Sequence, residues 1–214
     1  MNTHGGKTLA KLAVAIEMST VYSLIQIFVW HWQFTSLSIA WFILILLLAT
    51  HWWHRDTMTK LGFRVDNFFP ALKEAVWASV PFILVLVVIG FLTGRIWTIP
   101  LQQESILPSL RYTAWGTFQQ YGLQGYFHNR LMKVVSNPIL SSVLNGFIFM
   151  SLHIPNPILM AFTLLGGFAF SILYAKNRNI FALGILHGLV GLLLSNCFPK
   201  GILHNMRVGP GYFR

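Results

Sequence analysis

The sequence predicts an all-α fold, a polytopic membrane helix bundle with about seven transmembrane helices, each needing about 20 apolar residues to cross. Hydrophobic residues make up 55% of the 214 residues. Charged residues make up only 9%, against roughly 25% in an ordinary soluble domain. These charged residues gather in short clusters between long uncharged stretches. Composition and distribution together indicate a single integral membrane domain over residues 1–214.

The uncharged stretches place the individual helices. Met18 to His54 is long enough for two helices, with a turn at Gln33–Ser38. Val134 to Ala175 is again long enough for two. His153-Ile-Pro-Asn-Pro157 separates them, because two prolines so close together cannot both continue a helix. The expected helices lie at about residues 12–32, 36–53, 75–94, 112–129, 134–153, 158–175 and 180–198.

Two long connections carry many of the charges. Arg55–Glu74 is amphipathic, which suits a segment at the membrane surface. Arg95–Arg111 contains two prolines that we expect to break helices, Pro100 and Pro108, and a single acid, Glu104. We therefore expect both segments to lie outside the hydrocarbon core.

Small residues mark close packing in the last two helices. They follow one face of each helix, at Thr163, Gly167, Ser171 and Ala175 and at Gly184, Gly188 and Gly191. Such faces let a neighbouring helix approach closely. The lone Cys197 excludes an intramolecular disulfide and is expected to be packed. The basic tail from Pro199 contains Gly-Pro-Gly, which argues against an eighth span.

The charge distribution predicts the orientation. With the amino terminus inside, inner segments hold ten of the 15 Lys and Arg residues and outer segments five, as the positive-inside rule requires. Lys11 and Glu17 interrupt the first apolar stretch, so no cleaved signal peptide is expected. No aromatic-basic motif accompanies the excess charge, so no nucleic acid partner is expected. The expected location is a bacterial inner membrane, with membrane lipids as partners.

A polar stripe crosses the fourth expected helix. Thr117, Gln120, Gln124 and His128 follow one another at spacings of three, four and four, which places them on one helical face. A buried amide without a hydrogen bond costs about 1 to 3 kcal/mol. The stripe therefore either holds helices together or lines a site.

Two histidines on later helices are the expected partners of this stripe. His153 closes the fifth helix and His187 lies inside the seventh, so both can converge with Gln119 and Gln120 on one cavity. Histidines that only hold the bundle together by hydrogen bonds are the alternative.

Asn145 and Phe149 share a helical face with His153. With Gln124 and His128, we expect them to bind substrate or support the site. Glu17 either reaches the headgroups or supplies a carboxylate to the site. His51 and His54 are more typical of interfacial anchors than of metal ligands, so neither a metal nor another cofactor is expected.

Three motifs on these helices resemble a known family. Phe149-x-x-x-His153 and His187 resemble the second and third motifs of the CPBP family (CAAX proteases and bacteriocin-processing enzymes). Gln119-Gln120-x-x-x-Gln124-Gly125 stands in the place of the first motif, Glu-Glu-x-x-x-Arg-Gly. The similar region covers about residues 111–196. The resemblance implies an all-helical intramembrane endopeptidase that acts on membrane-anchored or lipidated proteins or peptides.

The resemblance also implies roles for residues. In the family the first-motif glutamate activates water, and the two histidines, with an Asn or Asp four residues after the second, position it and stabilise the oxyanion. By position, His153 and His187 take the histidine roles and Gln119 stands at the base. Gly191 replaces the Asn or Asp. Glutamine cannot act as a general base near pH 7.

Three functions remain open from the sequence. The favoured one is an altered intramembrane endopeptidase-like enzyme, with His153 or His187 as base and the glutamines holding substrate. The second is a catalytically inactive binding or chaperone protein that keeps the cavity. A small transporter is the third, although the sequence has no inverted repeat to suggest one.

Overall fold

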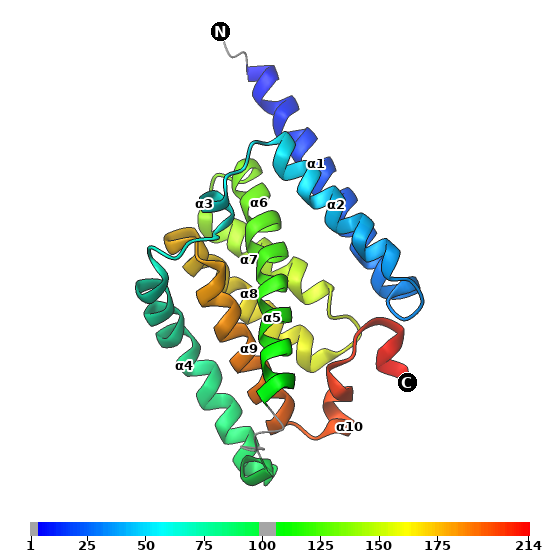
Figure 1. Ribbon diagram of the computed structural model, residues 1–214, viewed down its shortest axis with the longest axis vertical. Coiled ribbons are helices and arrows are strands. Elements are labelled where there is room, and N and C mark those ends of the chain that lie inside the picture. Colours follow the sequence, from blue (N-terminus) through cyan, green and yellow to red (C-terminus); the bar gives the residue numbers. More distant parts are fainter. Residues whose placement is uncertain (1–3, 99–105) are drawn as a thin grey trace.

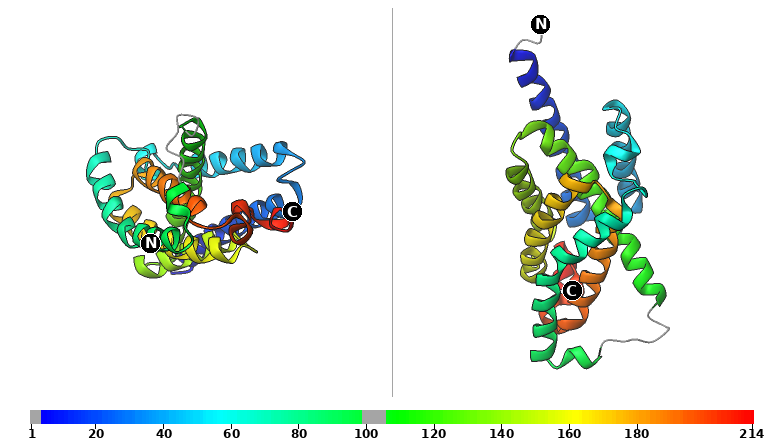
Figure 2. Two further views of the ribbon diagram at one scale, coloured as in Figure 1. Left: turned by 90° about the horizontal axis from the view of Figure 1, so that it is seen from below. Right: turned by 90° about the vertical axis from the view of Figure 1, so that its left-hand side faces the viewer.

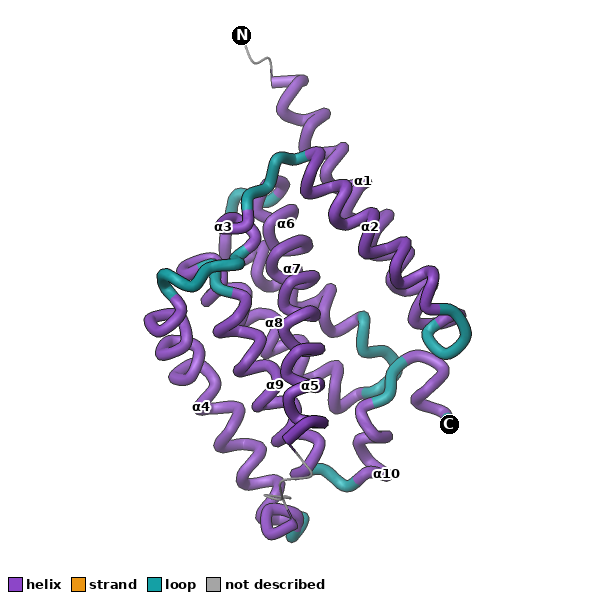
Figure 3. The backbone as a smooth tube through the Cα atoms, viewed as in Figure 1, coloured by secondary structure: helices purple, strands orange, loops and turns teal. Residues whose placement is uncertain are grey.

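The computed structural model describes residues 4–98 and 106–214 of the chain. Within them the regular elements are helices, which confirms the all-α prediction (Figures 1 and 3). They are α1 (His4–Ile27), α2 (Leu37–Trp53), α3 (Met58–Leu61), α4 (Phe68–Leu92), α5 (Ile106–Gln120), α6 (Asn129–Val134), α7 (Pro138–Ser151), α8 (Pro157–Asn177), α9 (Ile180–Cys197) and α10 (Lys200–Leu203). A π-helical stretch, Tyr121–His128, joins α5 to α6.

Helix length and apolarity agree with a polytopic membrane protein. Four described helical segments are long and apolar enough to cross a membrane, Gly5–Trp32, Phe68–Leu92, Pro157–Asn177 and Ile180–Cys197. The shorter apolar helices are α2 and α7. The continuous helix from α5 to α6 carries the polar stripe. Together these elements form the expected membrane helix bundle.

Two boundaries differ from the prediction because a proline can be accommodated in the first turn of a helix. α4 begins at Phe68 and not near residue 75, so Pro70 lies in its first turn and not in a surface connection. α5 begins at Ile106, so Pro108 does not break a helix either. Pro100 and Glu104 lie outside the described residues.

The packing of the central helices depends on the predicted small-residue faces. A Cβ at Gly188 of α9 would lie 2.6 Å from Thr113 Oγ1 of α5, and one at Gly184 would clash with Thr117. In the α7–α8 pair, a Cβ at Gly167 would lie 3.0 Å from Gly146 Cα. These close approaches bring the polar residues of neighbouring helices within hydrogen-bond reach.

α1 and α2 form a hairpin on one side of the bundle and diverge from their common turn (Figures 1 and 2). Val21 of α1 and Ile43 and Leu47 of α2 pack around Tyr126 and Phe127 of the π-helical stretch. The hairpin is therefore anchored by aromatic residues from the helix that carries the polar stripe.

The carboxyl-terminal tail folds back on the loop that follows α7 and makes no eighth span (Figure 1). The Gly209 amide donates to the Ile154 carbonyl at 2.8 Å. Asn156 Nδ2 donates to the Leu203 carbonyl at 2.8 Å and to the Arg207 carbonyl at 3.2 Å. These bonds hold the tail beside His153.

Candidate functional site

A cavity of about 220 Å³ lies between α4, α5, α8, α9 and the tail. Its polar lining includes Gln119, His153 and His187, and Phe82, Phe162 and other apolar side chains form most of its wall. The sequence predicted that these three polar residues converge, and the structure brings them together. The cavity combines a small polar group with a large apolar wall.

His187 is held by the polar stripe. Gln120 is fully buried, and its Nε2 donates to His187 Nδ1 at 2.8 Å. A neutral imidazole that accepts at Nδ1 carries its proton on Nε2. His187 therefore presents an N–H donor.

His153 is held in the opposite proton arrangement. Its Nδ1 donates to the Phe149 carbonyl at 2.8 Å, one turn back along the chain. The neutral ring then carries its proton on Nδ1 and a lone pair on Nε2. The cavity thus has one imidazole acceptor and one imidazole donor, each fixed by a different partner.

Phe149 brings the two histidines together. Its ring lies edge-on to His153, with 4.8 Å between centroids, and 5.7 Å from the His187 ring. Phe149 is itself buried against Gly167, where an added Cβ would lie 3.2 Å from Phe149 Cβ and would require the neighbours to shift. The shared face of Phe149 and His153 agrees with this geometry, and the supporting role of Phe149 stays a prediction.

The two adjacent glutamines have different positions. Successive residues on a helix point about 100° apart, so Gln119 lines the cavity while Gln120 lies behind His187. Gln119 is thus placed to contact a bound molecule. Gln120 orients an imidazole.

Tyr112 is a cavity residue that the sequence reading missed. A side chain at Gly191 would clash with the Tyr112 phenol, which lies where that side chain would extend. The Tyr112 hydroxyl donates to Met206 Sδ of the tail at 3.9 Å. Gly191 lies one helical turn from His187. A glycine at this position could have indicated that a large side chain of α5 packs against it.

The structure does not bring the other predicted supporting residues of the stripe to the cavity. Gln124 Oε1 accepts from Asn145 Nδ2 at 3.3 Å and from Ser171 Oγ at 3.2 Å. His128 Nε2 lies 3.3 Å from Ser142 Oγ, further along the helix. All three predicted residues are fully buried and link α7 and α8 to the π-helical stretch. Their role in the structure is to join helices.

Glu17 lies in a separate cluster, which we call the Arg130 network: Glu17, His51, His54, Asp56, Arg130 and Lys133. Glu17 Oε1 accepts from Arg130 Nε at 3.0 Å, and its Oε2 lies 2.6 Å from His54 Nε2. Both oxygens are thus taken, and neither bonds to a cavity histidine. The expectation that Glu17 supports the cavity site has no counterpart in this geometry.

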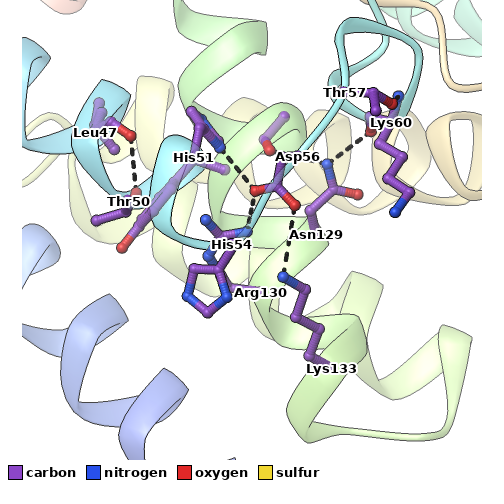
Figure 4. A network of polar contacts seen from close by, with 12 residues as sticks. Leu47, Thr50, His51, His54, Asp56, Thr57, Lys60, Asn129, Arg130 and Lys133 are labelled. Atoms are coloured by element: carbon purple, nitrogen blue, oxygen red, sulfur yellow. Dashed lines mark hydrogen bonds and ion pairs between the residues drawn. The ribbon is translucent and has the colours of Figure 1, made fainter.

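Asp56 is the second acid of the Arg130 network (Figure 4). Its Oδ2 lies 2.7 Å from Arg130 Nη1 and 3.0 Å from His51 Nδ1. Burial alone would raise the pKa of the Asp56 carboxyl, but the hydrogen bonds from His51 and Arg130 outweigh burial and lower it. His51 and His54 are therefore partners of carboxylates.

Metal-binding side chains do not gather in the described part of the chain. Within residues 4–98 and 106–214, no group of three or more His, Cys, Asp or Glu side chains is arranged to hold a metal ion. The cavity offers two imidazoles and the amide of Gln119, and a catalytic zinc ordinarily has three protein ligands of nitrogen, sulfur or carboxylate type. That no cofactor is used stays a prediction.

The fold and the cavity define an integral membrane protein with a polar site enclosed between apolar helices. The sequence model of the type II CAAX prenyl endopeptidase Rce1-like family matches residues 80–193, which include Gln119, Gln120, His153 and His187. This match covers more than half of the 214 residues. The chain therefore belongs to this family, and membership suggests a CAAX protease-type intramembrane function. No curated protein and no solved structure matches it.

Proposed function

We propose that this protein cleaves a peptide bond in membrane-anchored or lipidated proteins or peptides, within the cavity that holds His153 and His187. The observation that carries this proposal is the opposite proton arrangement of the two imidazoles. A lone pair on one side of a cavity and an N–H donor on the other are what attack by water on a carbonyl needs.

The reaction follows from this arrangement. His153 Nε2 takes a proton from a water molecule, and the water oxygen attacks the carbonyl carbon of the scissile amide. The His187 Nε2–H donates a hydrogen bond to the carbonyl oxygen as negative charge develops on it. The tetrahedral intermediate then breaks its C–N bond, and the proton on His153 passes to the leaving nitrogen. As proposed, the step uses no cofactor.

The apolar wall supports the choice of substrate class. Phe82, Phe162, Phe170 and Leu194 line the cavity beside the histidines. Burying apolar surface contributes about 25 cal/mol per Å², so a hydrophobic chain or segment would be held there while a peptide bond lies at the imidazoles. Membrane lipids and a membrane-anchored substrate are the expected partners.

We place the protein in a bacterial inner membrane with its amino terminus inside. The charge distribution supports the orientation, since ten of the 15 Lys and Arg residues then fall on inner segments. Protease protection of tags at either end, in sealed inverted vesicles, tests it.

The cavity can be tested with purified protein in vesicles and a panel of lipidated peptides, with products read by mass spectrometry. His153→Ala and His187→Ala should each lower turnover on the order of 100 to 10,000 fold, the usual contribution of a general acid or base. His31→Ala, which changes an exposed histidine outside the cavity, is the matched control. Unchanged turnover in both cavity variants would show that the site is wrong.

A second function is favoured by one specific observation. The described cavity lining contains glutamine and histidine but no carboxylate. A catalytically inactive family member could use the same cavity to hold a lipidated segment without changing it. Peptide that co-purifies intact with the wild type, and also with His153→Ala, would establish this binding function.

A further inference from the structure

A groove of about 560 Å³ lies at the far end of α1 from its turn with α2, apart from the histidine cavity. It is formed by the first turns of α1, the end of α2 and α6. Its polar lining is Lys7, Lys11, Glu17, His54 and Lys133, and Trp53 and small apolar residues complete it. Three amines from two distant parts of the sequence therefore surround one groove.

The positive charge of the groove is not neutralised by its own acid. Both oxygens of Glu17 are already engaged, by Arg130 and by His54. Among the described residues, Lys7 and Lys11 have no carboxylate within ion-pair distance. Lys133 Nζ lies 3.6 Å from Asp56 Oδ1, and the other oxygen of Asp56 binds Arg130. The groove therefore keeps an excess of positive charge.

The buried Arg130 network does not add to this charge. Arg130 is fully buried and bonds to both Glu17 and Asp56. With Lys133, the two acids and two bases of this cluster balance. The excess positive charge of the groove therefore comes from Lys7 and Lys11, and charges near low-dielectric protein are less screened than charges in water.

The length of the first span places the groove at the membrane surface. Gly5–Trp32 has 28 residues, about 42 Å of helix at 1.5 Å per residue. The hydrocarbon core is about 30 Å thick, so the first turns, with Lys7 and Lys11, extend into the headgroup region. Leu12 and Trp53 beside them are 55% and 78% exposed and face where acyl chains and the interface would lie.

We propose that this groove binds the phosphate of an anionic phospholipid in the leaflet on the amino-terminal side. Lys7, Lys11 and Lys133 contact the phosphate, and the acyl chains run along the exposed apolar face of α1. The lipid is the occupant favoured over a soluble phosphate compound because the charged groove continues directly into exposed apolar surface. The proposal does not depend on the function of the histidine cavity.

Native mass spectrometry of the full-length protein in neutral detergent tests the proposal. The protein is incubated with equal amounts of dioleoylphosphatidylglycerol and dioleoylphosphatidylcholine, and the retained lipid is counted. The wild type should retain phosphatidylglycerol. Lys7→Gln/Lys11→Gln should lower that retention about 30-fold, since each basic residue near an anionic surface contributes about 1 kcal/mol. Lys60→Gln/Lys73→Gln, which removes two exposed lysines elsewhere, should retain it.

Each other outcome overturns the proposal. Equal loss in both double variants would show a diffuse charge effect and no groove site. Equal retention of the two lipids by the wild type would show that charge is not recognised. If inorganic phosphate at millimolar concentration displaces the lipid and protects the protein from thermal unfolding as well as phosphatidylglycerol does, a soluble phosphate compound is the occupant. Helix content by circular dichroism confirms that the compared variants are folded.

Discussion

The histidine cavity and the Arg130 network use similar residues in opposite ways. In the network, His51 and His54 each lie within 3.0 Å of a carboxylate, and Arg130 bonds to both acids. In the cavity, His153 and His187 bond to a backbone carbonyl and to an amide. Charged groups are thus paired with each other at one end of the bundle. The cavity site is made of neutral groups in an apolar wall, where unpaired charge would cost most.

This difference separates histidines that pair with carboxylates from histidines that line the proposed site. The pairs His51–Asp56 and His54–Glu17 have the geometry of an acid-base dyad. However, their acids are held by a fully buried arginine, and the family match contains the cavity histidines but neither pair. The network is therefore best understood as a structural tie between α1, the loop after α2, and α6.

The largest predicted effect comes from a substitution that breaks the Arg130 network. Arg130→Gln leaves Glu17 and Asp56 without their common partner in a buried setting. Removing one partner of a buried ion pair costs about 3 to 5 kcal/mol, so thermal unfolding in detergent should move to a clearly lower temperature. Arg64→Gln removes the arginine of an exposed pair with Asp66 and should change the unfolding temperature little. Equal shifts would show that the network is no structural tie.

The next effect makes the cavity more like the network by adding a carboxylate. Gln119→Glu places an acid in the cavity beside His153 and His187, where it can act as a general base. Turnover of a lipidated peptide should rise by up to about 100-fold, because the carboxylate adds a second group beside His153 that can take the proton from water. Gln120→Glu is the matched control, because residue 120 lies behind His187 and cannot reach water in the cavity. A larger gain from Gln120→Glu would reverse the assigned roles of the two positions.

The sequence predicted the bundle, the small-residue faces and the meeting of His153, His187 and the glutamines. The first two features follow from hydropathy and helical spacing, which are local. The meeting of the polar residues follows from the order of the helices and the side of the membrane at which each residue lies. The sequence did not predict that the residues of the polar stripe contact two different parts of the bundle. The reason is that Tyr121–His128 is π-helical, which changes the number of residues per turn. Gln124 and His128 therefore bond to α7 and α8 instead of the cavity.

The sequence also missed the burial of Arg130, which it placed at the end of the fourth helix. The arginine is fully buried because Glu17 and Asp56, 113 and 74 residues away in the chain, bond to it. Helix periodicity carries no information on pairs so far apart. For the same reason, the sequence predicts a place for Glu17 at the headgroups or in the site and does not predict its bond to Arg130.

A smaller effect sharpens the description of the cavity. Tyr112→Phe removes one hydroxyl from the lining, next to the space above Gly191. If the phenol donates to substrate or water during the reaction, turnover should fall about fivefold, since a neutral hydrogen bond contributes about 1 kcal/mol. The thermal unfolding temperature is the control measurement. A lower unfolding temperature with unchanged turnover would assign Tyr112 to packing alone.

The smallest predicted effect is the pH dependence of stability that Asp56 gives to the Arg130 network. Hydrogen bonds from His51 and Arg130 lower the pKa of Asp56 in spite of its burial, so the folded state binds a proton to this carboxyl less readily than the unfolded state does. The contribution to stability is complete above the unfolded pKa, about 3.9. It is lost as the pH falls through the lower folded value. The difference in unfolding temperature between the wild type and Asp56→Asn should therefore be constant from pH 7 to about 5 and narrow below about 4. Asp56→Asn should start from a lower unfolding temperature and decline less steeply in acid, because the titrating carboxyl is gone. An equally steep decline in that variant would mean that acid acts on another group, and Asp56 would then not couple the network to pH.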